Sequence, residues 1–257
     1  MQVIEANGLV VTDTIFASTR GTAPMAGIDF EPNEARNKIS GVRFMNCRVV
    51  ENAGAGVQFA LHAFTERTEP MDVQFFSTLI VSPPSVCYPG AAGCYTKKPY
   101  YRWGILIEAN TKSLPSGSIR MIDTTVLDKG HWSSPPVWVE KSAGPSAPLM
   151  VDFNNLTVNT SRGAPAISVS ATGTAGISGG VRMVDVVVNR QCCPHGGPFL
   201  TATSSHQNKL VDVSLFGATV YVNRTDDDAA AAIECNATLS PDATSNKVIV
   251  SHVACER

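Results

Sequence analysis

The sequence predicts an all-β solenoid, a single-stranded parallel β-helix, and three observations predict it. Two short segments recur along the 257 residues at intervals close to 30 residues, as in repeat proteins. Both segments alternate apolar and polar residues and are rich in β-branched side chains, which is typical of strands. Clusters of Gly, Pro, Ser and Asn separate the segments, and no helical period of ten or more residues appears.

The first recurring segment reads Val-x-Val/Phe/Met-x-polar. Clear copies are VRFMN (42–46), IRMID (119–123), VDFNN (151–155) and VRMVD (181–185). All copies begin with an apolar residue: Leu9, Val42, Val73, Ile119, Val151, Val181, Val211 and Val248. We expect about eight coils of roughly 30 residues, with one such strand from each coil stacked in parallel.

The second recurring segment reads small-apolar-x-apolar-x. Its first apolar positions are Ile28, Val57, Ile105, Val137, Ile167, Phe199 and Ile233. Both segments show one long interval at the same place, which predicts an insertion loop over residues 82–103 within a single domain spanning 1–257. QVIEAN (2–7) matches ILIEAN (105–110), so we expect the chain to open inside a repeat, as a fragment of a longer one would.

Other repeat architectures fit less well. Leucine-rich repeats need a Leu/Asn skeleton that is absent here, and propeller blades run to about 40–45 residues with four strands each. Coils of two or three short strands that stack on one another fit a parallel β-helix. At a strand spacing of roughly 4.8 Å, eight coils give a rod on the order of 35 Å long.

The fifth position of the first segment is polar in most copies. It is occupied by Asp13, Asn46, Ser77, Asp123, Asn155, Asp185, Leu215 and His252. We expect an internal ladder of side chains that bond along the stack, since Asn and Asp also tolerate the left-handed conformation where a coil bends. The alternative is a set of ordinary solvated turn residues.

AGIDFEPN (26–33), followed by ISGVRFMNCRVVENAGAGVQF (39–59), resembles the right-handed parallel β-helix repeat proteins of the pectate-lyase-like superfamily. The resemblance implies a right-handed solenoid along nearly the whole chain. The superfamily contains polysaccharide lyases, glycoside hydrolases, epimerases and proteins without known catalysis, and fold alone does not choose among them. The motifs of polygalacturonases and of mannuronan epimerases are absent.

Alternation in the GIDFEPN strand puts Ile28 and Phe30 into the core and the residues between them outward. The same register gives three outward files across the coils. The first file is Val3, Asp29, Gln58, Leu106, Trp138, Ser168, Leu200 and Glu234. The second file is Glu5, Glu31, Ala60, Glu108, Glu140, Ser170, Ala202 and Asn236. The third file is Asn7, Asn33, His62, Asn110, Ser142, Thr172, Ser204 and Thr238.

The carboxylates of these files are the candidate catalytic residues: Asp29, Glu31, Glu108 and Glu140. Glu108 and Glu140 lie on successive coils, roughly 5 Å apart by strand spacing. Two carboxyl groups about 5–9.5 Å apart are the apparatus of glycoside hydrolysis. Glu108 and Glu140 are instead suited to Ca²⁺, in which case a lyase base would come from Lys112, His62 or His131. The alternative without function is a solvated acidic strand edge.

Aromatic residues gather near the same carboxylates. All three tryptophans flank Glu108 and Glu140, and exposed tryptophan rings offer flat surfaces on which sugars stack. We therefore expect a groove over residues 27–142, walled by the 82–103 loop. The expected substrate contacts are Asn33, Gln58, His62, Trp103, Asn110, His131, Trp132 and Trp138.

Sequons and cysteines favour a secreted or cell-surface glycoprotein, although no signal peptide is visible. Four Asn-x-Ser/Thr sequons occur. Asn159, Asn223 and Asn236 are the expected glycosylation sites, whereas Asn155 is expected to be buried in the ladder. Cys87 and Cys94 are expected to close a small disulfide loop.

Composition excludes several classes of function. Twenty Lys and Arg against 22 Asp and Glu give a net charge of −2, too balanced for a nucleic-acid footprint. No apolar run is long enough for membrane insertion. Two hypotheses remain: a polysaccharide hydrolase or lyase that acts through the acidic face, or a non-catalytic solenoid that binds glycans or mediates adhesion.

Overall fold

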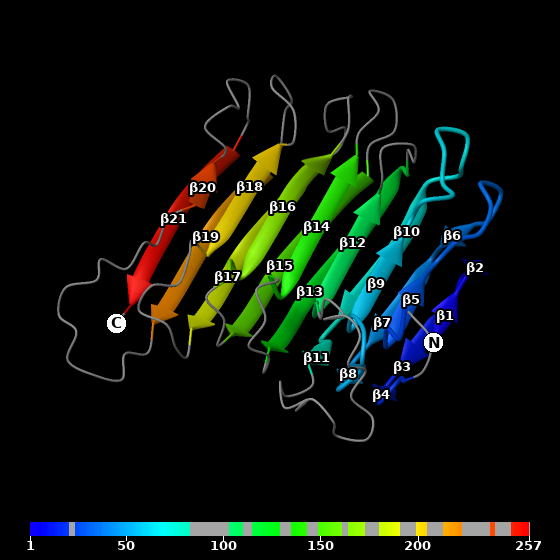
Figure 1. The fold of residues 1–257 in the computed structure, drawn as a ribbon, viewed down its shortest axis with the longest axis horizontal. Helices are drawn as coiled ribbons and strands as arrows, with labels where there is room; N and C mark the ends of the chain where they lie inside the picture. The colour runs from blue at the N-terminus through cyan, green and yellow to red at the C-terminus, as the bar shows by residue number, and fades with distance from the viewer. Residues whose placement is uncertain are drawn as a thin grey trace, which may run out of the picture.

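In the computed structural model, the chain is an all-β parallel solenoid, which confirms the predicted fold class. The structure describes residues 1–20, 24–82, 103–109, 115–128, 135–142, 149–160, 164–172, 180–190, 199–204, 213–222, 237–239 and 248–256. No helix occurs among these residues. Every strand pairs in parallel with strands from neighbouring coils, and the termini lie at opposite ends of the long axis (Figure 1).

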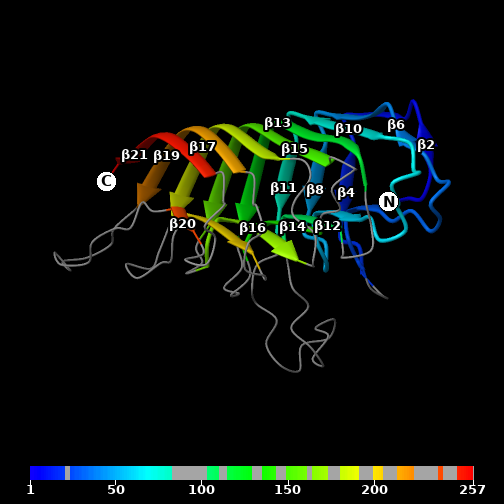
Figure 2. The ribbon, with the colours of Figure 1, turned by 90° about the horizontal axis from the view of Figure 1, so that it is seen from above.

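Two large sheets form two layers along this axis (Figure 2). The eight-stranded sheet consists, in spatial order, of β1 (Gln2–Val3), β5 (Ile28–Phe30), β9 (Val57–Ala60), β12 (Ile105–Ala109), β14 (Val137–Ser142), β16 (Ile167–Thr172), β18 (Leu200–Ser204) and β20 (Ala237–Leu239). We call its surface opposite the core the outer face of the eight-stranded sheet.

The second large sheet has eleven strands. Its main path is β3 (Val10–Thr12), β7 (Val42–Met45), β10 (Met71–Phe76), β13 (Gly117–Asp128), β15 (Leu149–Thr160), β17 (Val181–Arg190), β19 (Val213–Val222) and β21 (Val248–Glu256). Three short strands continue it beyond a bend: β4 (Ile15–Ala17), β8 (Arg48–Val50) and β11 (Leu79–Val81). A small third sheet pairs β2 (Ala6–Asn7) with β6 (Ile39–Ser40).

The core follows from strict alternation along each strand. In β10, for example, every second residue is buried, beginning with Met71. Phenylalanines stack across coils: the rings of Phe30 and Phe59 lie 4.5 Å apart, and those of Phe44 and Phe75 lie 4.8 Å apart. Because a parallel stack places equivalent residues above one another, one aromatic position per repeat produces a continuous apolar column.

The glycines that precede β5, β9 and β12, which are Gly27, Gly56 and Gly104, have a steric cause. A Cβ atom on Gly56 would collide with the side chain of Ile80 and the carbonyl of Gly104. Glycine is therefore required where the coil turns tightly against the next strand.

The polar bend residues of the eleven-stranded sheet form a ladder along the coils, as predicted. Asp13, Asn46, Ser77, Asp123, Asn155 and Asp185 all have φ between 49° and 55°. The Asn46 amide donates to Asp13, and the Asn155 amide donates to Asp123 over 2.8 Å. The ladder is external rather than internal, because all six side chains are exposed. The expected burial of the Asn155 sequon is therefore wrong.

The seventh ladder position is Gly217, not Leu215. Leu215 is buried opposite Met183, so Gly217 lies opposite Asp185 and has a φ of 75°. The repeat begins at Val213 rather than Val211, because Val213 is the residue that lies opposite Val181. His252 does lie opposite Gly217 in the register of β21.

Candidate functional site

The candidate site lies on the outer face of the eight-stranded sheet, over β5, β9, β12 and β14. Alternation places Ile28 and Phe30 in the core, each without exposed surface, and puts Asp29 and Glu31 on the opposite side. The same parity holds in β12, where Ile105 and Ile107 are buried in the core and Glu108 is half-buried on the outer face.

Register confirms the expected neighbours in the middle of the sheet. Glu108 pairs with Glu140 on one side and with Ala60 on the other. Adjacent parallel strands lie about 4.8 Å apart, so the two glutamates occupy neighbouring rungs. Glu31 is separated from Glu108 by the small Ala60, since Asp29 pairs with Gln58 and Gln58 pairs with Leu106. We call Glu31, Glu108 and Glu140, together with Asp29, the acidic file.

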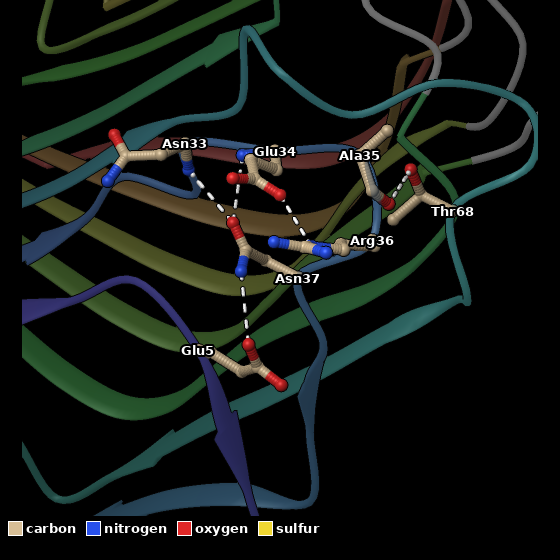
Figure 3. A network of polar contacts seen from close by, with 7 residues as sticks. All are labelled: Glu5, Asn33, Glu34, Ala35, Arg36, Asn37 and Thr68. Atoms are coloured by element: carbon tan, nitrogen blue, oxygen red, sulfur yellow. Dashed lines mark hydrogen bonds and ion pairs between the residues drawn. The ribbon is translucent and has the colours of Figure 1, made fainter.

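The first coil is shifted by one residue from the prediction. Gln2, not Val3, lies opposite Asp29, and Val3 is buried opposite Phe30. The similarity between QVIEAN and ILIEAN predicts a register that is wrong by one residue. A shift of one residue moves every side chain to the other face of the sheet. Glu5 accordingly leaves the acidic file, and it accepts a hydrogen bond from the amide of Asn37 in the loop after β5 (Figure 3).

A second correction concerns β18. Thr201 lies opposite Ser168 on the outer face, whereas Leu200 and Ala202 are fully buried. The repeat begins at Leu200 rather than Phe199. The outer face beyond Glu140 therefore presents Ser168, Ser170 and Thr201, and the hydroxyl of Thr201 donates to that of Ser168 over 3.0 Å.

Asp29 is the most buried carboxyl group of the acidic file, with 4% of its surface exposed. Its Oδ1 atom is buried without a hydrogen-bond partner. The pKa of Asp29 is raised to about 6, chiefly by burial and then by the charge of Glu31 and a side-chain hydrogen bond with Glu31, while the ammonium group of Met1 opposes the shift. Gln2 Nε2 donates to Glu31 Oε2 over 2.8 Å.

Glu108 is the second carboxyl group of the acidic file with a raised pKa. Burial is the largest cause that raises its pKa, and the neighbouring Glu140 raises it further, whereas the imidazole of His62 lowers it. His62 is exposed just after β9, and its charge acts on Glu108. A carboxyl group that holds its proton beside an ionised one is the arrangement of a general acid and its partner.

The two described tryptophans pack against each other. The rings of Trp103 and Trp138 lie 5.3 Å apart at 58° and cover a small apolar cluster with Ala26, Ala55 and Leu106. Trp138 Nε1 donates to the Ser170 hydroxyl over 3.0 Å. Trp103 and Trp138 thus pack against Leu106, which sequence alternation alone would have left exposed, and both rings remain partly exposed.

The remaining predicted contacts are placed as follows. Gln58 is half-buried between Asp29 and Leu106. Asn33 is exposed on the turn after β5, and its backbone N–H donates to Asn37 Oδ1 over 3.1 Å (Figure 3).

Sequence reasoning missed Asn37, which is buried and organises this turn. Its Oδ1 atom also accepts the Glu34 N–H, and Thr68 donates to the Ala35 carbonyl close by. The signal was an Asn at the end of the Glu-Pro-Asn-Glu-Ala-Arg-Asn loop, a residue type that caps turns through its side chain.

Several predictions fall outside the described residues. These are the contacts Asn110, His131 and Trp132, the Cys87–Cys94 disulfide, the sequons Asn223 and Asn236, and most of the 82–103 loop. Asn159 is half-buried within β15 and accepts a hydrogen bond from Asn189 over 2.7 Å. Cys47 is a buried free thiol.

The described part of the chain contains no cluster of three or more His, Cys, Asp or Glu side chains suited to a metal ion. Glu108 and Glu140 alone supply two carboxylates, fewer ligands than Ca²⁺ takes. Over the same residues, no helix has the length and apolar character to cross a membrane.

Comparisons of the chain with protein-family models, with curated proteins and with solved structures found no match. The chemistry of the site is therefore argued from its own residues.

Proposed function

We propose that this protein is a secreted, carbohydrate-active β-helix that hydrolyses a polysaccharide on the outer face of the eight-stranded sheet. The observation that carries the proposal is the Glu108–Glu140 pair, in which two carboxyl groups occupy neighbouring rungs and one has a raised pKa. We further propose a right-handed solenoid of about eight coils, related to the pectate-lyase-like superfamily.

The proposed reaction uses the pair in two steps. Glu108, as the protonated acid, gives its proton to the glycosidic oxygen while the Glu140 carboxylate attacks the anomeric carbon. Glu108 then removes a proton from water, and that water displaces the sugar from Glu140. A separation near 5 Å corresponds to this retaining mechanism rather than to an inverting one. Trp103 and Trp138 would support the sugar ring beside the pair.

The test is a screen of the purified protein against neutral, uronate-containing and amino-sugar polysaccharides, with and without Ca²⁺. New reducing ends and the absorbance of unsaturated products are read together. We expect reducing ends without unsaturated products, and we expect Glu108→Gln and Glu140→Gln each to lower the rate by about 10²-fold or more. Asp185→Asn, which removes a carboxylate on the ladder, is the matched control and should leave the rate unchanged.

Two other outcomes have definite meanings. Unsaturated products would make the protein a lyase, with His62 as the candidate base beside Glu108. Binding without any product would favour a glycan-binding solenoid. That second candidate is supported by the Trp103–Trp138 pair, because two partly exposed rings suffice to hold a sugar chain without chemistry.

A further inference from the structure

We propose that the polysaccharide is cationic, an amino-sugar polymer whose free ammonium groups bind along the acidic file. This inference rests on the proposed function for the surface on which the polymer lies. It adds the charge of the substrate, which the catalytic pair alone does not specify.

The outer face of the eight-stranded sheet carries several acidic side chains. Asp29, Glu31, Glu108 and Glu140 belong to one face, and no ion pair joins them to a Lys or Arg within the described ranges. Elsewhere in the molecule carboxylates are neutralised: Arg43 binds Asp72 over 2.8 Å on the eleven-stranded sheet. Among the described residues, the outer face of the eight-stranded sheet therefore presents carboxyl groups without a Lys or Arg partner, an arrangement that attracts a polycation and repels a polyuronate.

Asp29 has an unsatisfied hydrogen-bond acceptor, a feature that does not depend on the charge of the surface. Its Oδ1 atom is buried on this face without a donor, although buried polar atoms normally have one. Gln2 and Gln58, its neighbours across the strands, leave that oxygen without a hydrogen bond. An ammonium group, which offers three N–H donors, would supply the hydrogen bond that this oxygen lacks.

The position of Trp138 along its strand favours the same ligand. Trp138 lies on the outer face in line with Leu106 and Gln58. It precedes Glu140 by two residues in β14, as Leu106 precedes Glu108 in β12. An ammonium group that rests against an indole face while paired to a carboxylate gains a cation–π interaction of about 0.5–1 kcal/mol at an exposed site. Neutral sugars would use the rings alone and leave the acidic file unmatched.

Calcium bridging would offer an anionic polymer another route to this surface. It needs several carboxylate oxygens around one ion, and the described residues bring no three acidic or His side chains together for it. The cationic polymer is therefore the charged substrate that matches the described surface directly.

The experiment is calorimetric titration of the full chain with three hexasaccharides: glucosamine, N-acetylglucosamine and galacturonate, each at mildly acidic pH in low and physiological salt. We expect the glucosamine oligomer to bind at least about tenfold more tightly than its acetylated counterpart at low salt, and to lose most of this preference as salt screens the charges. Galacturonate should not bind.

Variants assign the binding to the acidic file. Glu31→Gln and Glu140→Gln should each weaken glucosamine binding by about fivefold and leave binding of the acetylated oligomer unchanged. Asp185→Asn on the ladder removes an equal charge and should change neither. Thermal unfolding of each variant checks that it folds.

The outcomes separate this inference from the proposed function. Tight glucosamine binding without cleavage supports the cationic ligand and contradicts the hydrolase. Cleavage of a neutral or uronate polymer, with no preference for glucosamine, supports a carbohydrate-active enzyme and overturns the cationic substrate. Equal binding of the charged and acetylated oligomers also overturns it.

Discussion

Two columns of acidic side chains run along the solenoid, the exposed ladder and the acidic file, and their carboxyl groups have different neighbours. On the exposed ladder, carboxylates alternate with amides, so that Asn46 donates to Asp13 and Asn155 donates to Asp123. In the acidic file, Glu108 lies directly beside Glu140, and Asp29 shares a hydrogen bond with Glu31. The ladder shows that this fold can satisfy stacked carboxylates by interleaving amides, whereas no amide separates Glu108 from Glu140.

The neighbouring carboxyl groups of the acidic file affect one another's ionisation. Parallel stacking repeats each side chain at the strand spacing of about 4.8 Å, so a repeated acid meets its own charge on the next coil. In the acidic file, burial and like charge raise the pKa values of Asp29 and Glu108. A cost of this kind is typical of functional sites, and four substitutions test the comparison.

The largest effect is expected at the ladder. Asp123→Val places a β-branched residue where φ is 52° and removes the acceptor of Asn155. We expect the free energy of unfolding to fall by about 2–3 kcal/mol, measured by urea denaturation. Asp123→Asn keeps a residue type that already occurs at Asn46 and Asn155, and should cost less than about 0.5 kcal/mol. Equal costs for the two variants would show that the left-handed bend does not constrain the position.

Asp29→Asn should stabilise the protein at neutral pH, whereas Asp123→Val should destabilise it. The folded-state pKa of Asp29, about 6, lies above its ordinary value of 3.8, so the folded state loses stability as pH rises through this window. Removing the charge should therefore add about 1–2 kcal/mol at a pH near 8, after allowance for solvent screening, and little at a pH near 4. Denaturation at both pH values measures this, and a loss of stability at neutral pH would contradict it.

Glu140→Gln should add about 0.5 kcal/mol at neutral pH by removing a like charge opposite Glu108. The gain should vanish in acid, where the raised pKa of Glu108 leaves its carboxyl group protonated and without a charge to repel. Thermal melts across pH report the change, with Glu51→Gln, a carboxylate at another corner of the coil, as the matched control. A gain that persists in acid would mean that packing, not charge, is responsible.

The smallest effect is expected for Asn46→Gly. Glycine accepts the left-handed φ of 54° at no steric cost, so the substitution removes little more than the hydrogen bond to Asp13. We expect a loss of about 0.5 kcal/mol, because both groups are exposed and water replaces the lost partner. A loss as large as that of Asp123→Val would make the ladder a cooperative network.

Much of the fold could be predicted because register in a solenoid is a property of the repeat. The copies from Val42 to Val181 and the strands from Ile28 to Ile167 pair as the spacing indicates. The errors arose toward the ends, where the register differs by one to four residues: β20, for example, places Ala237 rather than Ile233 opposite Leu200. A shift of one residue exchanged Gln2 for Val3, and a shift of two exchanged Gly217 for Leu215.

The site could be predicted only as far as alternation reaches. Alternation put Glu108 beside Glu140 and Asp29 on the outer face. It carried no information about the turn that Asn37 organises or about how the rings of Trp103 and Trp138 cover Leu106. These features depend on side chains that meet between coils and loops, whose separation no sequence period encodes.

The central claim is that Glu108 and Glu140 form one interacting acid pair. The most direct measurement is an NMR titration of the Glu108 side-chain carboxyl carbon in the native chain and in Glu140→Gln. The account predicts a pKa above the ordinary glutamate value in the native chain and a lower one in the variant, because the charge of Glu140 raises it. An ordinary pKa that is unchanged by the substitution would mean that the two carboxyl groups diverge, and would contradict the claim.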